Sequence, residues 1–291
     1  MNNKKLKIKF SVRKHFSIII FSLLSFNVSA KEQANTTIEF LKKNTQKHAL
    51  QLLKDPVFRS LSIGIYKDGK AYTGYFGELE KGKKANDKTF FEIASVTKSF
   101  TGTLVAQAVL DGKFSVDDDI RKYLEKDYPN LAFKDKPIKI RHLITHTSGL
   151  PANHKDFEAV PFNNDDGLLW NRLHLAEKNY TKTKFFQDLK EIVIEQEPGT
   201  QFLYSNLGTN MVAHILERVY KKTYQKLLQE FIFNKAGMHN TKLNLSSMEE
   251  KLLAGGFNEK GVRMPALPLG KTLWGAEGAL KATLPDRLFT A

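Results

Sequence analysis

The tetrapeptide Ser95-Val96-Thr97-Lys98 places a serine and a lysine three positions apart. Positions i and i+3 of a helix are neighbours on one face, so the Lys98 amine can reach the Ser95 hydroxyl. A serine hydroxyl is a poor nucleophile until a base removes its proton, and lysine is such a base once burial or nearby cations favour its neutral form. Backbone N–H groups at the helix start, including that of Ser95, would stabilise the oxyanion of an acyl-transfer intermediate.

The S-x-x-K spacing is not specific by itself, because Ser11 and Lys14 repeat it. The surroundings favour Ser95, since a strand-like segment over 90–94 precedes it and an apolar helix over about 95–110 follows. The simpler alternative is an ordinary serine near a helix start, with a solvated lysine one turn later. A second motif is needed to decide between the two interpretations.

Tyr204-Ser205-Asn206 supplies that second motif. In an extended stretch the side chains at i and i+2 share a face, so Tyr204 and Asn206 can point into one cavity. A phenol beside a lysine can relay protons, and an amide can hold the lysine or a substrate carbonyl. Tyr128-Pro129-Asn130 has the same spacing but lies in a charged loop, whereas Tyr204 precedes a predicted helix over 206–221.

Other patterns support competing chemistries less well. Residues 77–84 differ at one position from a phosphate-binding loop, but Lys84 stands where a hydroxyl is required. His142 and His146 are four apart and could share a metal, yet no third ligand is evident, so a structural role is favoured. The acidic run 117–119 is better explained as a helix start than as a cation site. We therefore expect no metal and no cofactor.

Three segments resemble, in the same order, motifs of the serine β-lactamase-related hydrolases, which include class C β-lactamases, D-alanyl-D-alanine carboxypeptidases and related esterases. They are Ser95–Lys98, Leu143–Leu150 and Glu197–Asn206, and the segments Ala236–Met238 and Trp274–Gly278 are also similar. The resemblance runs from about residue 35 to about residue 285. It is specific because the three motifs occur jointly and in order.

The resemblance implies a role for each residue of the two motifs. Ser95 would be the acylated nucleophile, Lys98 its proton acceptor, and Tyr204 the partner base and leaving-group acid. Asn206 would contact the substrate amide or the lysine. The implied activity is hydrolysis of an amide or ester bond through an acyl-enzyme, with a β-lactam, a D-Ala-D-Ala peptide or a small ester as substrate. A cell-wall polymer is a further candidate partner.

A third element of that family, a strand reading K-T-G or H-x-G, is not found before Ala291. Lys271-Thr272-Leu273 has leucine where glycine is needed and lies before the 274–278 segment. The strand supplies a second oxyanion donor, and the loss of one such donor costs about 10²–10³ in rate. The alternative hypothesis is therefore a truncated member that is catalytically impaired or only binds peptides or cell-wall fragments. A hairpin over 61–75 would then lack sheet neighbours.

The elements around these motifs predict an α+β fold. They comprise a helix over 36–53, strands around 61–65 and 71–75 joined by an Asp68-Gly69 turn, helices over 183–195, 206–221 and 223–233, and glycine-rich loops after 250. By resemblance the fold is β-lactamase/transpeptidase-like, an antiparallel sheet flanked by helices, with C-terminal sheet strands missing. We expect one domain over 31–291 with a helical subdomain at about 115–250.

Composition and the N-terminus set the remaining expectations. The 291 residues are 41% hydrophobic and 26% charged, which is globular composition, and the absence of cysteine excludes a thiol nucleophile. The net charge is +14, but no basic run alternates with aromatic residues, so no nucleic-acid partner is expected. Residues 1–30 resemble a signal peptide, with a basic start, an apolar run over 16–28 and cleavage after Ala30. That run is too short to span a bilayer comfortably, so the mature protein is predicted to be periplasmic or secreted without a stable membrane span.

Overall fold

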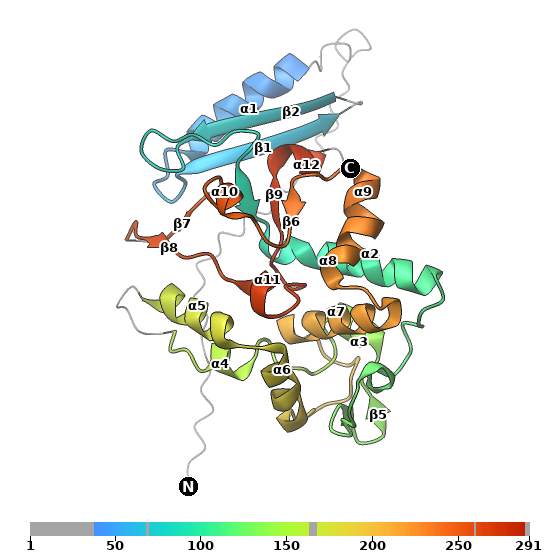
Figure 1. Cartoon of the computed structure of the whole chain (residues 1–291). Coiled ribbons are helices and arrows are strands. Elements are labelled where there is room, and N and C mark those ends of the chain that lie inside the picture. The colour runs from blue at the N-terminus through green and yellow to red at the C-terminus, as the bar shows by residue number, and fades with distance from the viewer. Residues whose placement is uncertain (1–37, 68–69, 163–167, 259, 289–291) are drawn as a thin grey trace.

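The computed structural model describes residues 38–67, 70–162, 168–258 and 260–288 (Figure 1). The α-helices are α1 (Ile38–Leu52), α2 (Thr97–Leu110), α3 (Ile140–Ile144), α4 (Lys155–Glu158), α5 (Leu169–Asn179), α6 (Lys182–Asp188), α7 (Asn206–Tyr220), α8 (Tyr224–Leu228), α9 (Asn234–Ala236), α10 (Ser247–Glu250), α11 (Leu269–Thr272) and α12 (Leu284–Leu288). Short 3₁₀ turns cover Ala94–Val96, Ile120–Tyr123 and Leu189–Glu191, and a π-turn covers Gln229–Phe233.

The strands form small antiparallel sheets. They are β1 (Ser60–Lys67), β2 (Lys70–Gly77), β3 (Phe90–Glu92), β4 (Ala132–Phe133), β5 (Lys136–Pro137), β6 (Thr241–Lys242), β7 (Gly256–Phe257), β8 (Arg263–Met264) and β9 (Lys281–Thr283). Within the described ranges β1 pairs only with β2, and β3, β9 and β6 form a three-stranded sheet in that order. The β1–β2 hairpin packs against α1 and α12 (Figure 1). The predicted α+β class is confirmed.

The N-terminal elements match the sequence pattern. Helix α1 falls within the predicted 36–53, and β1 and β2 contain both predicted strands. Their register runs to Lys67 opposite Lys70, so the hairpin connection is two residues long. The turn residues 68–69, the S-x-x-K of Ser11 and Lys14, and the predicted signal peptide over 1–30 lie outside the described residues. No helix in the described part of the chain is long and apolar enough to cross a membrane.

Helix α7 is the centre of the helical layer. Its residues 207–216 are all buried, and it packs against α2 and α3. A helix that is covered on every face must be surrounded by other elements, which fixes its position in the molecule. The first residue of α7 is Asn206, so the core also fixes one of the candidate site residues.

Several element boundaries differ from the prediction. The helix predicted over 183–195 ends with a 3₁₀ turn at Glu191, and the one predicted over 223–233 changes into a π-turn after Leu228. The glycine-rich region after 250 is not only loop, because it contains the β7–β8 hairpin, α11 and the central strand β9. Strand β9 is three buried residues long, too short for a period of two to be visible in sequence.

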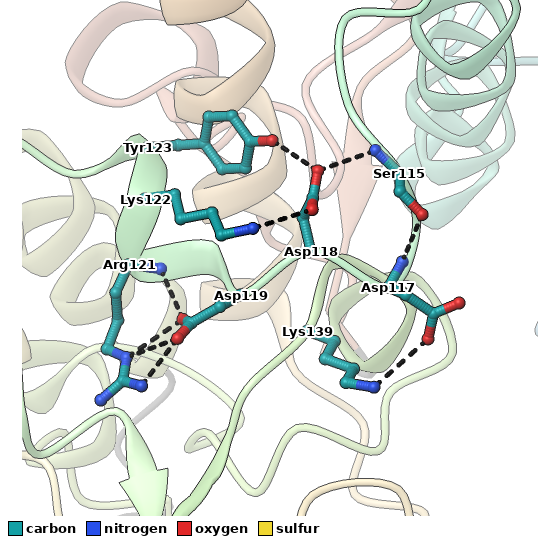
Figure 2. Close-up of polar contacts among 8 residues, drawn as sticks. All are labelled: Ser115, Asp117, Asp118, Asp119, Arg121, Lys122, Tyr123 and Lys139. Carbon is teal, nitrogen blue, oxygen red and sulfur yellow. Dashed lines mark hydrogen bonds and ion pairs between the residues drawn. The ribbon is translucent and has the colours of Figure 1, made fainter.

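The aspartates at 117–119 start a helical turn, as predicted (Figure 2). Asp119 caps the 3₁₀ turn by accepting the Arg121 N–H, and it also pairs with the Arg121 guanidinium. The Ser115 N–H and further donors hold the pKa of Asp118 at about 2. The donors drawn around the three carboxylates are Ser115, Arg121, Lys122, Tyr123 and Lys139. The cluster therefore orders the loop that leads into the 3₁₀ turn of Ile120–Tyr123, and Asp117 ties this loop to Lys139, directly before α3.

His214 on α7 generates a prediction about stability. It is buried against Phe186 and Trp274, and burial lowers its pKa to about 4. An unfolded histidine has a pKa near 6.5, so the folded state loses stability as pH falls from 6.5 toward 4. Between pH 7 and pH 5 this group should cost about 2 kcal/mol of unfolding free energy.

The measurement is urea unfolding at pH 7 and pH 5 for wild type and His214→Gln. The variant should lose less stability than wild type between the two pH values, whatever its stability at pH 7. His239→Gln, which changes an exposed histidine, should retain the wild-type difference. Equal pH sensitivity in wild type and His214→Gln would contradict this assignment.

Candidate active site

Ser95 lies on the turn that joins β3 to α2. The chain leaves β3 at Glu92, Ala94 takes a left-handed conformation (φ 44°), and the 3₁₀ turn of Ala94–Val96 runs directly into α2. The sequence predicted that Ser95 begins the helix, but the structure places it on the 3₁₀ turn directly before α2. Lys98 lies in the first turn of α2. Residues three apart are superimposed along a 3₁₀ turn, so the predicted contact survives this difference.

The start of α2 is tied to the loop that precedes β9. The Ile93 N–H donates to the Leu280 carbonyl (3.0 Å), and the Leu280 N–H donates to the Thr97 hydroxyl (3.2 Å). One turn later the Thr101 hydroxyl donates to the Ala276 carbonyl (3.0 Å). These bonds fix the backbone of 276–280 beside Ser95 and Lys98.

Ser205 positions the second motif because it caps α7. Its hydroxyl accepts the Gly208 N–H (2.9 Å) and donates to the Pro151 carbonyl (2.6 Å). Its own N–H donates to Nδ1 of His146 (3.2 Å). Asn206 N–H donates to the Ala152 carbonyl (2.8 Å). Hydrogen bonds thus hold the segment around Tyr204 against residues 146–152.

The two histidines have structural roles in this docking. His142 accepts the Lys139 N–H at the start of α3, and its ring faces Gly199 so closely that a side chain at 199 would lie 3.2 Å from Nε2. Gly199 also has φ 101°, which favours glycine. The centroids of the His146 and Tyr204 rings are 4.3 Å apart. The main-chain carbonyl of His146 accepts a hydrogen bond from the Leu203 N–H.

The four predicted site residues meet at one point. Ser95 Oγ lies 2.7 Å from the Tyr204 hydroxyl and 3.3 Å from the Lys98 amine. Lys98 Nζ also donates to Asn206 Oδ1 (2.7 Å), and it lies 4.8 Å from the centre of the Tyr204 ring. The nucleophile therefore has two candidate proton acceptors within reach, which is the geometry that acyl transfer requires.

Sequence reasoning missed one partner of the lysine. Lys98 Nζ donates to the main-chain carbonyl of Glu277 at 2.5 Å. Every residue type carries a main-chain carbonyl, so the sequence cannot identify this acceptor. The only indication was the resemblance of residues 274–278 to a segment of the family. The alternative pair Tyr128 and Asn130 is structural, since both side chains donate to main-chain carbonyls.

The Ser95 hydroxyl faces a cleft of about 700 Å³. Its walls combine apolar side chains, Trp170, Met264 and Leu269 among them, with the polar groups of Asn206 and Arg263. A pocket with a few convergent polar groups among apolar walls is typical of a small-molecule site. The rejected segment Lys271-Thr272-Leu273 lies on and just after α11, not on a strand, and Lys271 pairs with Glu250.

Comparison with known proteins finds relatives among the β-lactamases. A family model described as Beta-lactamase matches residues 45–287. Protein flp of Staphylococcus aureus (strain N315) is 27% identical over 230 residues, which cover 78% of this chain and 43% of that protein. A protein named Beta-lactamase from Pseudomonas fluorescens is 26% identical over 213 residues, covering 72% of this chain and 53% of that protein. The chain thus spans about half the length of these curated relatives.

A solved structure extends the likeness to three dimensions. The crystal structure described as Beta-lactamase/D-alanine carboxypeptidase from Yersinia pestis aligns with a TM-score of 0.65 at 25% identity. The alignment covers 79% of this chain and 61% of that one.

The closeness of His146 to Lys98 generates a prediction. Burial lowers the pKa of His146, and the positive charge of Lys98 lowers it further. Replacing Lys98 by methionine removes that charge and should raise the His146 pKa. Histidine ¹³C NMR titration measures this directly, and Lys113→Met, just beyond the far end of α2, should leave the midpoint unchanged. An unchanged His146 midpoint in Lys98→Met would show that the two groups are further apart than described.

Proposed function

This chain belongs to the beta-lactamase family, and we propose that it is an exported serine hydrolase in which Ser95 forms an acyl-enzyme with an amide or ester substrate. The family and its structural neighbours are serine hydrolases of the β-lactamase and carboxypeptidase type, and the predicted β-lactamase/transpeptidase-like fold is confirmed. One observation carries the proposal: the Ser95 hydroxyl lies between the Tyr204 hydroxyl and the Lys98 amine.

In the first half-reaction Ser95 Oγ bonds to the substrate carbonyl carbon while its proton passes to Lys98 or Tyr204. The tetrahedral intermediate then collapses, the C–N or C–O bond breaks, and Tyr204 returns a proton to the leaving group. Asn206 holds the lysine in place through its carbonyl oxygen and can meet a substrate amide at the cleft wall. A water molecule then attacks the ester carbon, the bond from that carbon to Ser95 Oγ breaks, and the product leaves as an acid that carries the water hydroxyl. The second water proton returns to Ser95 Oγ through Tyr204 or Lys98.

The substrate class follows from the relatives and the cleft. The names of the Pseudomonas and Yersinia proteins support a β-lactam or a D-Ala-D-Ala peptide, with a small ester as the third option. Apolar walls with few polar groups fit all three. The basic and apolar pattern of residues 1–30 supports export to the periplasm or beyond, where a cell-wall polymer would be a further partner.

Covalent labelling tests this proposal. Purified protein incubated with a fluorescent penicillin and, separately, a fluorophosphonate should be labelled at Ser95, and Ser95→Ala should remove the label. Ser99→Ala is the matched control, because Ser99 is one turn further on α2 and bonds only the Val96 carbonyl in the described structure. Folded wild-type protein that retains penicillin-derived fragments without a covalent bond would instead favour the non-catalytic binding alternative.

Tyr204→Phe gives a second prediction. The substitution removes the hydroxyl at 2.7 Å from Ser95 Oγ and keeps the ring that packs on His146. A positioned acid–base group contributes about 10²–10⁴ in rate, so the rate constant for labelling should fall by that factor with thermal stability nearly unchanged. Tyr66→Phe, at an exposed tyrosine on β1, should label like wild type. Full reactivity of Tyr204→Phe would assign the proton transfer to Lys98 alone.

A further inference from the structure

A small cavity of about 100 Å³, lined by both polar and apolar side chains, adjoins the substrate cleft. Asn206 and Glu277 line both this cavity and the substrate cleft, so they form part of the wall between the two. The polar side chains that complete the cavity are Asn153, His154, Glu177 and Asn210. The acyl-transfer steps proposed for Ser95, Lys98 and Tyr204 do not require two buried glutamates here.

The lining groups are deeply buried and incompletely paired. Glu277, Glu177, His154 and Asn210 are each no more than 6% exposed. Of the seven buried side-chain atoms without a hydrogen-bond partner in the described part of the chain, three belong to this lining, namely Glu277 Oε2, His154 Nε2 and Asn210 Oδ1. His154 Nε2 lies 3.2 Å from Glu177 Oε1, but not in hydrogen-bond geometry. Buried polar atoms are nearly always satisfied, so three exceptions around one cavity point to a functional reason.

Glu277 connects this cavity to the lysine. Its main-chain carbonyl accepts the hydrogen bond from Lys98 Nζ, and its carboxyl lies within electrostatic reach of the same amine. Burial raises the pKa of Glu277 to about 7, and the charge of Glu177 adds to that rise. A hydrogen bond from Asn210 and the charge of Lys98 act in the opposite direction.

The groups that face Glu277 come from four elements. Lys98 approaches from α2, Glu177 from α5, Asn210 from α7, and the Tyr224 phenol from α8. His154, before α4, lies next to Glu177. Lys98 is the cation in this set, so an ionised Glu277 carboxyl attracts the Lys98 ammonium.

We propose that Glu277 is a positioning residue whose buried carboxyl sets the charge state of Lys98. With the carboxyl protonated, only neutral oxygens hold the Lys98 amine, so a neutral Lys98 that can accept the proton of Ser95 is easier to form. With the carboxyl ionised, its negative charge favours the ammonium form, which cannot act as a base. This inference rests on the proposed acyl-transfer function and adds a control on its pH range.

The test is the pH dependence of Ser95 labelling by a fluorophosphonate, measured as a second-order rate constant from pH 5 to pH 10. Glu277→Gln keeps the size of the side chain and removes its charge. The rise of rate with pH should therefore move about one pH unit lower than in wild type, the low end of the effect of a nearby opposite charge. The rate on the acidic limb would then increase about tenfold, with an unchanged plateau.

Glu195→Gln is the control, because Glu195 is an exposed glutamate that lines neither the cleft nor this cavity. Its profile should coincide with that of wild type. Coincident profiles for Glu277→Gln and wild type, or equal shifts in both variants, would overturn the inference and leave the proposed function intact. Wild-type protein that is folded but never labelled at Ser95 would overturn both.

A second measurement does not depend on the folding of Glu277→Gln. In ¹³C NMR of side-chain carboxyls, wild type should show one glutamate with a midpoint near neutral pH, and Lys98→Met should raise that midpoint because an attractive charge is lost. If every glutamate titrates near the ordinary pKa of about 4.3, Glu277 is not held as described and the inference fails.

Discussion

The amine of Lys98 is the point on which the site depends. It contacts three oxygen atoms, those of the Ser95 hydroxyl, the Asn206 amide and the Glu277 main chain. A half-buried ammonium without such acceptors would be costly, because a charged group loses its hydration when it is buried. The three acceptors come from the turn before α2, the start of α7 and the loop before β9. Folding must bring these segments, distant in sequence, to within hydrogen-bond reach of one nitrogen.

Backbone conformation contributes to that convergence. Ala94, next to the nucleophile, and His146, beside Tyr204, both have positive φ without being glycine. Such conformations cost of order 1–3 kcal/mol each, and they persist only where surrounding bonds determine them. The bonds are present: Ile93 is held by Leu280, and His146 accepts the Ser205 N–H. Ala94 directly precedes Ser95 and His146 packs on Tyr204, whereas the other two described non-glycine residues with positive φ, Lys134 and Lys221, lie between β4 and β5 and at the end of α7.

The sequence predicts contacts made by side-chain atoms better than contacts made by main-chain atoms. Helix and strand spacing pair the side chains of Ser95 with Lys98 and of Tyr204 with Asn206. Only the resemblance to the hydrolase family joins the two pairs in one site, because spacing says nothing about segments about a hundred residues apart. Glu277 acts on Lys98 through a carbonyl, which every residue carries, and its carboxyl is hidden in a cavity that sequence cannot reveal. Strand β9 was not predicted for a related reason. All three of its residues are buried, so apolar and polar residues do not alternate along it, and it is too short for a pattern to be recognised. The helix α7, with its strong periodicity and its Ser205 cap, was predictable.

The burial of the Glu277 carboxyl affects the charge that it presents to Lys98. A serine hydrolase that uses lysine as a base must hold the amine by hydrogen bonds yet let it lose its charge. Neutral oxygens, such as those of Asn206 and the Glu277 main chain, hold it without fixing the charge, whereas an ionised carboxylate at the same distance would fix it. Burial in a cavity shared with Glu177 raises the pKa of the Glu277 carboxyl to about 7, so its negative charge is only partly present at pH 7. An ordinary exposed glutamate would be fully ionised there and would favour the ammonium form of a neighbouring lysine at every pH above about 5.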